Sequence, residues 1–216
     1  SGKYFDSILL RKLGDILSKY QNIFISSDDI YEHIHWNKEK FHNIINVCPE
    51  LKERVIILNG VSKAYSMTGW RIGYAAGNRD IIKKMKTLQS QSTSCASSIS
   101  QAAACAALTQ ECKEMDLMNS EYKKRHDFVV EQLNTIDGVI CKETDGTFYV
   151  FPSFKEYIAK NDSISNDAEL AHHMLNVAKV AVVPGSAFGQ EGHIRISIAI
   201  DMESLKEAMR RIISVL

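Results

Sequence analysis

The stretch Asn59–Tyr74, NGVSKAYSMTGWRIGY, indicates both the fold and a site. It directly follows the short apolar run Val55–Leu58, which is typical of a buried strand. It places Lys63 and Arg71 eight residues apart on a turn-prone loop. A lysine whose pKa is lowered by burial or by a nearby cation is a nucleophile, and a guanidinium binds phosphate or carboxylate. The stretch therefore predicts a site that holds an aldehyde as a Schiff base beside an anionic group.

Apolar patterning around this stretch predicts an α/β fold. A helical repeat over Asp6–Tyr20 precedes a short buried strand at Ile23–Asp28, and a third strand is expected at Ile72–Ala76. Short, uninterrupted apolar strands between helices are typical of a mainly parallel sheet with helices on both faces. Helices are then expected at Arg79–Gln89, Ile99–Leu108 and Lys113–Asn134.

The pattern changes after the turn signal Asp137-Gly138. Further elements are expected there: strands at Val139–Cys141, Thr147–Phe151, Val180–Val183 and His193–Ile200, and helices at Ala168–Ala178 and from Met202. We therefore expect part of a large domain over residues 1–120 and a small α+β domain over residues 121–216.

Composition excludes several classes of function. Lys plus Arg equals Asp plus Glu at 26 each, so no net charge favours nucleic acid or an anionic membrane. No apolar run approaches a membrane span, and the amino terminus lacks a secretory pattern. The five cysteines are scattered and form no CxxC pair, which favours reduced thiols in a cytoplasmic protein.

The expected strands suggest how a site would assemble. Ligands of open α/β sheets bind beyond the carboxyl ends of the strands. Asp28 ends one expected strand and Lys63 lies just past another, so parallel neighbours would bring both to one crevice. Arg71 instead precedes its strand, and it joins them only if that strand is antiparallel.

Residues 59–74 closely resemble the lysine motif of class I (fold type I) pyridoxal-phosphate-dependent aminotransferases, in particular the aspartate aminotransferase group. Ser27–Glu32, SDDIYE, is similar to the family's Ser-Asp-Glu-Ile-Tyr-Glu. Other matching segments are Gly146–Tyr149, Val182–Gly189 and His193–Ser197. The resemblance covers essentially the whole chain but only the carboxyl-terminal half of the family.

The resemblance implies roles in cofactor binding. Asp28 would pair with the pyridine nitrogen of pyridoxal phosphate, and Tyr31 would donate a hydrogen bond to the ring oxygen. Lys63 would hold the cofactor covalently and shuttle a proton in catalysis. Arg71 would bind the phosphate, with Ser62 as a hydroxyl partner.

The resemblance also implies a substrate site. Strand alternation places Ile194, Ile196 and Ile198 on one face and Arg195 on the other. By resemblance Arg195 would bind the α-carboxylate of an amino acid, with aspartate and 2-oxoglutarate as the preferred substrate pair. The family implies a homodimer, with the Ala- and Ser-rich region Ser90–Ala107 near the partner. A chain with only half of the fold is expected to be poorly active alone.

Other interpretations remain open at this stage. Lys63 and Arg71 taken alone would be solvated surface charges. Asp28 could instead cap a short helix over Asp29–His33, and Arg195 could be a simple exposed strand residue. No metal is predicted, because Glu32, His33 and His35 lack further ligands at supportive spacing. An aromatic or prephenate aminotransferase, a carbon–sulfur lyase of the same fold, and a non-catalytic dimerising fragment are the alternative functions.

Overall fold

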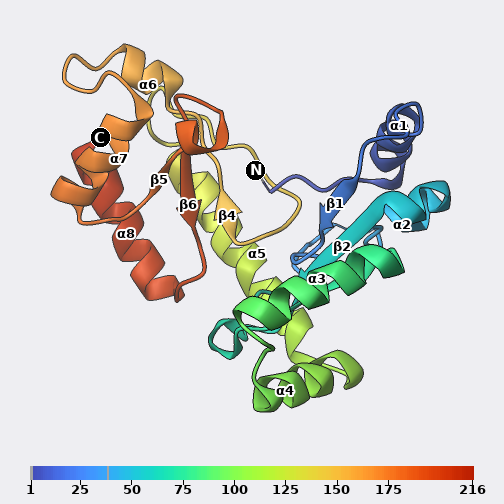
Figure 1. The fold of residues 1–216 in the computed structure, drawn as a ribbon. Helices are drawn as coiled ribbons and strands as arrows, with labels where there is room; N and C mark the ends of the chain where they lie inside the picture. Colours follow the sequence, from blue (N-terminus) through green and yellow to red (C-terminus); the bar gives the residue numbers. More distant parts are fainter. Residues whose placement is uncertain (1, 38) are drawn as a thin grey trace. The chain divides into compact units, whose positions relative to one another are not determined.

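The computed structural model describes residues 2–37 and 39–216, which form two compact units (Figure 1). One unit is Phe5–Asp116, and the other is Leu117–Leu216 with the described residues that precede Phe5. The division falls inside helix α5 (Glu114–Leu133). Each unit contains its own three-stranded sheet, so each is described separately.

The sheet of the Phe5–Asp116 unit has the order β1 (Ile25–Asp28), β2 (Val55–Gly60), β3 (Gly73–Gly77). Strands β1 and β2 are parallel, whereas β2 and β3 are antiparallel. The three strands expected from the sequence are confirmed, and so is the α/β class. Gly60 pairs with Gly73 across the antiparallel pair, and a Cβ on Gly60 would lie 2.8 Å from the carbonyl oxygen of Ile72. The close approach of the two strands therefore requires glycine at position 60.

Helix α1 (Ser7–Leu17) packs beside this sheet through one apolar stripe. Asp6 caps it by accepting the N–H of Leu9 at 2.7 Å. Gly14 allows close packing, because a Cβ there would lie 2.2 Å from Sγ of Cys48. The buried core around this contact combines α1, α2 (Ile44–Val47), the 3₁₀ helix η1 (Pro49–Arg54) and β2: Leu10, Ile44, Cys48, Leu51 and Val55.

A second apolar stripe of α1 is exposed. Within the helix it consists of Leu9, Leu13 and Ile16, and Phe5 before the helix and Tyr20 after it continue the spacing of three or four residues. Their exposed fractions lie between 38% and 56%. Nothing in the described residues of this unit covers the stripe.

The expected helices after β3 are confirmed as α3 (Arg79–Ser92) and α4 (Ser98–Thr109). The N–H of Asp80 is capped by the side chain of Asn78 at 2.9 Å, and α3 then packs against β3. In α4 only Ala104 is buried, and Ile99 is 73% exposed. The Ala-rich helix thus forms surface rather than core in the described chain.

The Leu117–Leu216 unit has an antiparallel sheet with the order β4 (Tyr149–Val150), β6 (Ile194–Ser197), β5 (Val183–Pro184). The predicted alternation in β6 is confirmed: Ile194, Ile196 and the following Ile198 are buried. The helices of this unit are most of α5, α6 (Lys155–Ala159), α7 (Asp167–His173) and α8 (Met202–Val215). Short helical segments are the π-helix η3 (Met174–Ala178) and the 3₁₀ helix η4 (Gly185–Phe188).

Several expected elements differ from the structure. The expected strand Val139–Cys141 makes only an isolated bridge between Ile140 and Ser153. The reason is that Asn134 satisfies the backbone of Cys141, accepting its N–H at 2.8 Å and donating to its carbonyl at 2.9 Å. The expected strand Thr147–Phe151 shortens to Tyr149–Val150, since Thr147 has a left-handed backbone with φ of 68°.

The expected helix Ala168–Ala178 changes character within its length. Its first part is the α-helix α7, and its second part is the π-helix η3. Lys179, with φ of 58°, then ends the helix in the left-handed conformation. In the described residues no helix is both long and apolar enough to cross a membrane, and all five cysteines are free.

Candidate active site

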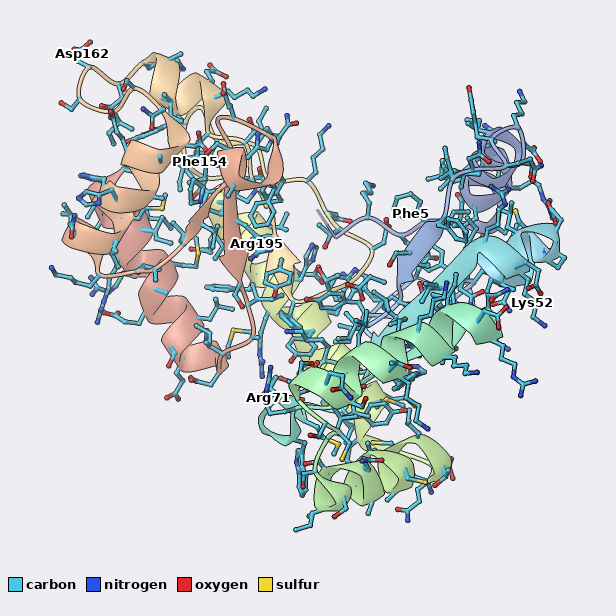
Figure 2. All side chains as sticks on the ribbon, in the orientation of Figure 1. Phe5, Lys52, Arg71, Phe154, Asp162 and Arg195 are labelled. Atoms are coloured by element: carbon cyan, nitrogen blue, oxygen red, sulfur yellow. The ribbon has the colours of Figure 1, made fainter. Side chains whose placement is uncertain are left out.

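Strand directions bring three predicted residues to one edge of the β1–β2–β3 sheet. Asp28 ends β1 opposite Leu58. Lys63 lies three residues beyond Gly60, the last residue of the parallel strand β2. Because β3 is antiparallel, Arg71 precedes its start at this same edge. Figure 2 shows Arg71 beyond the end of β2 and Lys52 at the opposite end of the sheet. The strand directions on which the expected crevice depends are confirmed.

The lysine loop is held by its own backbone. The N–H of Ser66 donates to the carbonyl of Lys63 at 3.1 Å, and the N–H of Met67 donates to the carbonyl of Val61 at 3.3 Å. Val61 and Ala64 are buried, whereas Ser62 and Lys63 are partly buried. Lys63 therefore sits on a turn whose apolar neighbours anchor it.

Arg71 has a left-handed backbone, with φ of 55°. It ends the 3₁₀ helix η2 (Thr68–Trp70), and its Nη1 donates to the carbonyl of Thr68 at 3.0 Å. A left-handed conformation costs a non-glycine residue about 1 kcal/mol and is found often at ligand sites. The side chain is exposed, so its remaining donors face solvent and are accessible to an anion.

The segment after β1 is a turn rather than a helix. Residues 30–33 form turns, and the Oδ1 of Asp28 accepts the N–H of Ile30 at 3.4 Å. The alternative interpretation of Asp28 as the cap of a helix over Asp29–His33 is therefore wrong. The turn is closed by the N–H of Ile34, which donates to the carbonyl of Tyr31 at 2.8 Å. The carboxylate of Asp28 is exposed and Tyr31 is partly buried.

A hydrogen bond between Asn59 and Glu32 links strand β2 to the turn after β1, and the sequence did not predict it. Nδ2 of Asn59 donates to Oε1 of Glu32 at 2.6 Å, while Oδ1 of Asn59 accepts the N–H of Gly60 at 2.7 Å. The pKa values of Tyr65 and Tyr74 are both raised. Burial of each ring is the largest cause, and the negative charge of Glu32 is the second. The only signal in the sequence is a polar Asn59 directly after an apolar strand.

Asp29 is a buried carboxyl beside the exposed Asp28. Its Oδ1 accepts the hydroxyl of Ser27 at 2.7 Å, while its buried Oδ2 has no hydrogen-bond partner among the described residues. Burial is the main cause that raises the pKa of Asp29, and the charges of Glu32 and Asp28 raise it further. An ionised Asp29 is therefore unfavourable in the folded state.

Replacing Asp29 with Asn is expected to stabilise the chain at pH 7, by an amount of the order of 1 kcal/mol. A raised folded-state pKa means that Asp29 contributes stability at low pH and loses it as the pH rises through that pKa. The gain from Asp29→Asn should therefore disappear below about pH 3.9, the ordinary pKa of an aspartate. Urea unfolding across this pH range measures it. The exposed neighbour Asp28→Asn is the matched control, and a gain that does not depend on pH would contradict the expectation.

Arg195 lies in the Leu117–Leu216 unit, on the central strand β6 (Figure 2). Its guanidinium lies over two aromatic rings, with the Cζ atom 4.5 Å from the Tyr149 centroid and 4.1 Å from the Phe188 centroid. Such cation–π contacts orient the plane of the guanidinium. Arg195 is therefore held by specific contacts, and the interpretation as a simple exposed strand residue is wrong.

Thr147 combines two unfavourable features just before Tyr149. It is β-branched with φ of 68°, and its Oγ1 is buried without a hydrogen-bond partner among the described residues. Thr147→Gly is expected to raise the free energy of unfolding by about 1 kcal/mol, because glycine adopts this φ freely. Chemical denaturation measures the change. Thr93→Gly is the control, because Thr93 has an ordinary φ of −100°. It should destabilise the chain, and equal effects at both positions would rule out relief of strain.

Among residues 2–37 and 39–216, no group of three or more His, Cys, Asp or Glu is placed to hold a metal ion. The carboxylate of Glu32 lies 3.5 Å from Nε2 of His33. The same carboxylate accepts the bond from Asn59, so its contacts are structural.

Comparisons with known proteins show the family of the chain. The profile of the family "Aminotransferase class I and II" matches residues 1–212. The chain belongs to this family. A relative named aspartate/prephenate aminotransferase from Nitrosomonas europaea is 45% identical over 221 residues, which cover 100% of this chain and 56% of the relative.

Solved structures agree on the fold of the family. The crystal structure of the aspartate aminotransferase from Rhizobium meliloti has a TM-score of 0.94 and 41% identity, covering 100% of this chain and 55% of that chain. The aromatic aminotransferase from Pyrococcus horikoshii has a TM-score of 0.89 and 36% identity, covering 100% and 56%. The chain thus spans just over half the length of these family members.

Proposed function

We propose that the protein carrying this chain is a pyridoxal-phosphate-dependent aminotransferase that acts on aspartate and 2-oxoglutarate. The observation that carries the proposal is the placement of Asp28, Lys63 and Arg71 at one sheet edge in a chain of this family. Since the chain spans 56% of the Nitrosomonas europaea relative, the activity is proposed for the whole protein. The 216-residue chain alone is expected to be poorly active.

The residue types at this edge fit the cofactor. The carboxylate of Asp28 suits a protonated pyridine nitrogen, and the amine of Lys63 suits an aldehyde. The guanidinium of Arg71 and the hydroxyl of Ser62 suit a phosphate. When bound, pyridoxal phosphate supplies an electron sink for the negative charge that develops at the substrate α-carbon.

The chain's own residues would then divide the work of transamination. Asp28 would hold the proton on the pyridine nitrogen, and Tyr31 would donate a hydrogen bond to the ring oxygen. Lys63 would take the proton from the α-carbon as a general base and return it as a general acid. Arg195 would bind the substrate α-carboxylate with its paired donors.

Covalent labelling tests this proposal directly. Pyridoxal phosphate is added to the protein, the product is reduced with borohydride, and the modified peptide is located by mass. We expect the label on Lys63 and its loss in Lys63→Arg, whereas Lys52→Arg, at the opposite end of the sheet, should label normally. A label on another lysine, or none in the whole protein, would refute the assignment.

The substrate is inferred from the names of the relatives. Two of the three relatives described are named for aspartate, one of them also for prephenate, and the third is named an aromatic aminotransferase. Aspartate is therefore our first choice, and an aromatic or prephenate aminotransferase is the alternative. Steady-state rates with aspartate, phenylalanine and prephenate separate them, and no turnover of aspartate would exclude the first choice.

A non-catalytic dimerising fragment is the second candidate function. The exposed apolar stripe on α1 favours it, because a surface of this kind is usually covered by further protein. The exposed Ala-rich helix α4 similarly supports a homodimer, and the free cysteines support the cytoplasm. Labelling of the whole protein decides between the two candidates, since a protein that only dimerises would leave Lys63 unmodified.

A further inference from the structure

The orientation of Arg195 depends on a loop that carries one of its two aromatic neighbours. Tyr149 lies in β4 and pairs with Ser197 in the same sheet as Arg195. Phe188 instead ends the short helix η4, and Gly189 follows it with φ of 73°. The Phe188 ring is 48% exposed, so burial alone does not hold it in place.

A buried carboxylate holds this loop from inside. Asp167 is the first residue of α7 and only 2% exposed. Its Oδ2 accepts the N–H of Ser186 at 2.7 Å. The hydroxyl of Ser186 and the N–H of Gly192 also favour the charged form of the carboxylate, so it faces both ends of the segment 186–192.

The hydrogen bonds decide the ionisation state of Asp167. Burial opposes the charged form, but the bonds from Ser186 and Gly192 outweigh it and hold the pKa of Asp167 below its ordinary value. The carboxylate is thus charged at neutral pH and has both oxygens available as acceptors.

The backbone of the segment closes on itself above this carboxylate. The N–H of Gln190 donates to the carbonyl of Gly185 at 3.0 Å, and the N–H of Gly185 donates to the carbonyl of His193 at 2.7 Å. A Cβ on Gly185 would lie 2.3 Å from the carbonyl oxygen of Gln190. The loop is therefore tight, and Asp167 is the side chain that ties it to α7.

We propose that Asp167 is a positioning residue that holds the segment Ser186–Gly192, so that Phe188 stacks on Arg195 and fixes the plane of its guanidinium. That this plane then matches a substrate carboxylate rests on the proposed function. A bidentate pair needs both donors in the plane of the carboxylate, so a tilted guanidinium binds through one donor only.

Two measurements test the proposal. In the 216-residue chain, Asp167→Asn is expected to shift the NMR resonance of the Arg195 Nε–Hε group, because the Phe188 ring moves relative to it. In the active enzyme, the same variant is expected to raise KM for the amino acid about tenfold with little change in kcat. An unchanged Arg195 resonance would overturn the proposal.

Asp201→Asn is the matched control. Asp201 also accepts a backbone N–H at a helix start, that of Ser204 at 2.8 Å, but its helix is α8. It should alter neither the Arg195 resonance nor KM, and equal effects from both variants would show a merely structural role for Asp167.

A second variant keeps the test decisive if Asp167→Asn does not fold. Phe188→Leu removes the exposed ring without touching the buried carboxylate. It should shift the Arg195 resonance and raise KM, and no change in either would overturn the proposal. Arg195→Lys tests the carboxylate role separately: an unchanged KM there would refute that role while the NMR result still decides on Asp167.

Discussion

Lys63→Ala is expected to lower kcat of the active enzyme about 10⁴-fold, the upper end of what one acid–base residue contributes. The loss has two causes, because Lys63 is the amine that would hold the cofactor aldehyde and also the group that would move the α-proton. Single-turnover absorbance measurements with a saturating amino acid separate the two. Binding of the cofactor should weaken, and proton transfer should become the slow step.

The controls for this prediction come from the same unit. Lys63→Arg keeps the positive charge but cannot form the covalent link, so it should be about as inactive as Lys63→Ala. Lys52→Ala removes an exposed lysine at the opposite end of the sheet and should leave kcat unchanged. Activity of Lys63→Ala within tenfold of the unmodified enzyme would be incompatible with the proposed role, because acid–base catalysis contributes about 10²-fold or more.

Arg195→Met is expected to raise KM for the amino acid about 100-fold, since loss of one partner of a hydrogen-bonded charge pair costs about 2–5 kcal/mol. Methionine keeps a long apolar side chain over the Tyr149 and Phe188 rings but has no donor for a carboxylate. Initial rates against amino-acid concentration measure the change.

Arg195→Lys should give a smaller rise in KM than Arg195→Met, because an ammonium keeps the charge but not the planar pair of donors. Arg125→Met is the control: Arg125 also lies over an aromatic ring, that of Tyr122 at 5.7 Å, but on helix α5. Equal KM values for Arg195→Met and the unmodified enzyme would show that another residue binds the carboxylate.

Much of the fold could be predicted from apolar spacing. The long helices α3, α4, α5 and α8 each lie within a few residues of the expected range, and α3 and α8 also begin at a side-chain cap. The short elements were harder to predict. The strand expected at Val139–Cys141 is wrong, because the side chain of Asn134 replaces a neighbouring strand as hydrogen-bond partner. Such competition between side chain and backbone leaves no periodic pattern.

For the candidate site too, some features could be predicted from the sequence and others could not. Asp28, Lys63 and Arg71 could be proposed because their residue types and motif spacing suit the chemistry. Two other features could not be predicted: the hydrogen bond between Glu32 and Asn59, and the burial of Asp29. The reason is that a polar residue near a strand end is equally common on a solvated loop. These features depend on which backbone segments the fold places next to one another.

The sequence by itself determined the residue types of the site, the order of helices and strands, and the family that the motif resembles. The tertiary structure decided the directions of the strands, which place Asp28, Lys63 and Arg71 at one edge. It also decided the aromatic pair around Arg195 and the buried Asp167 beneath its loop. The physical reason is range: apolar period and capping act over a few neighbouring residues, whereas strand pairing and ring stacking join residues far apart in the chain.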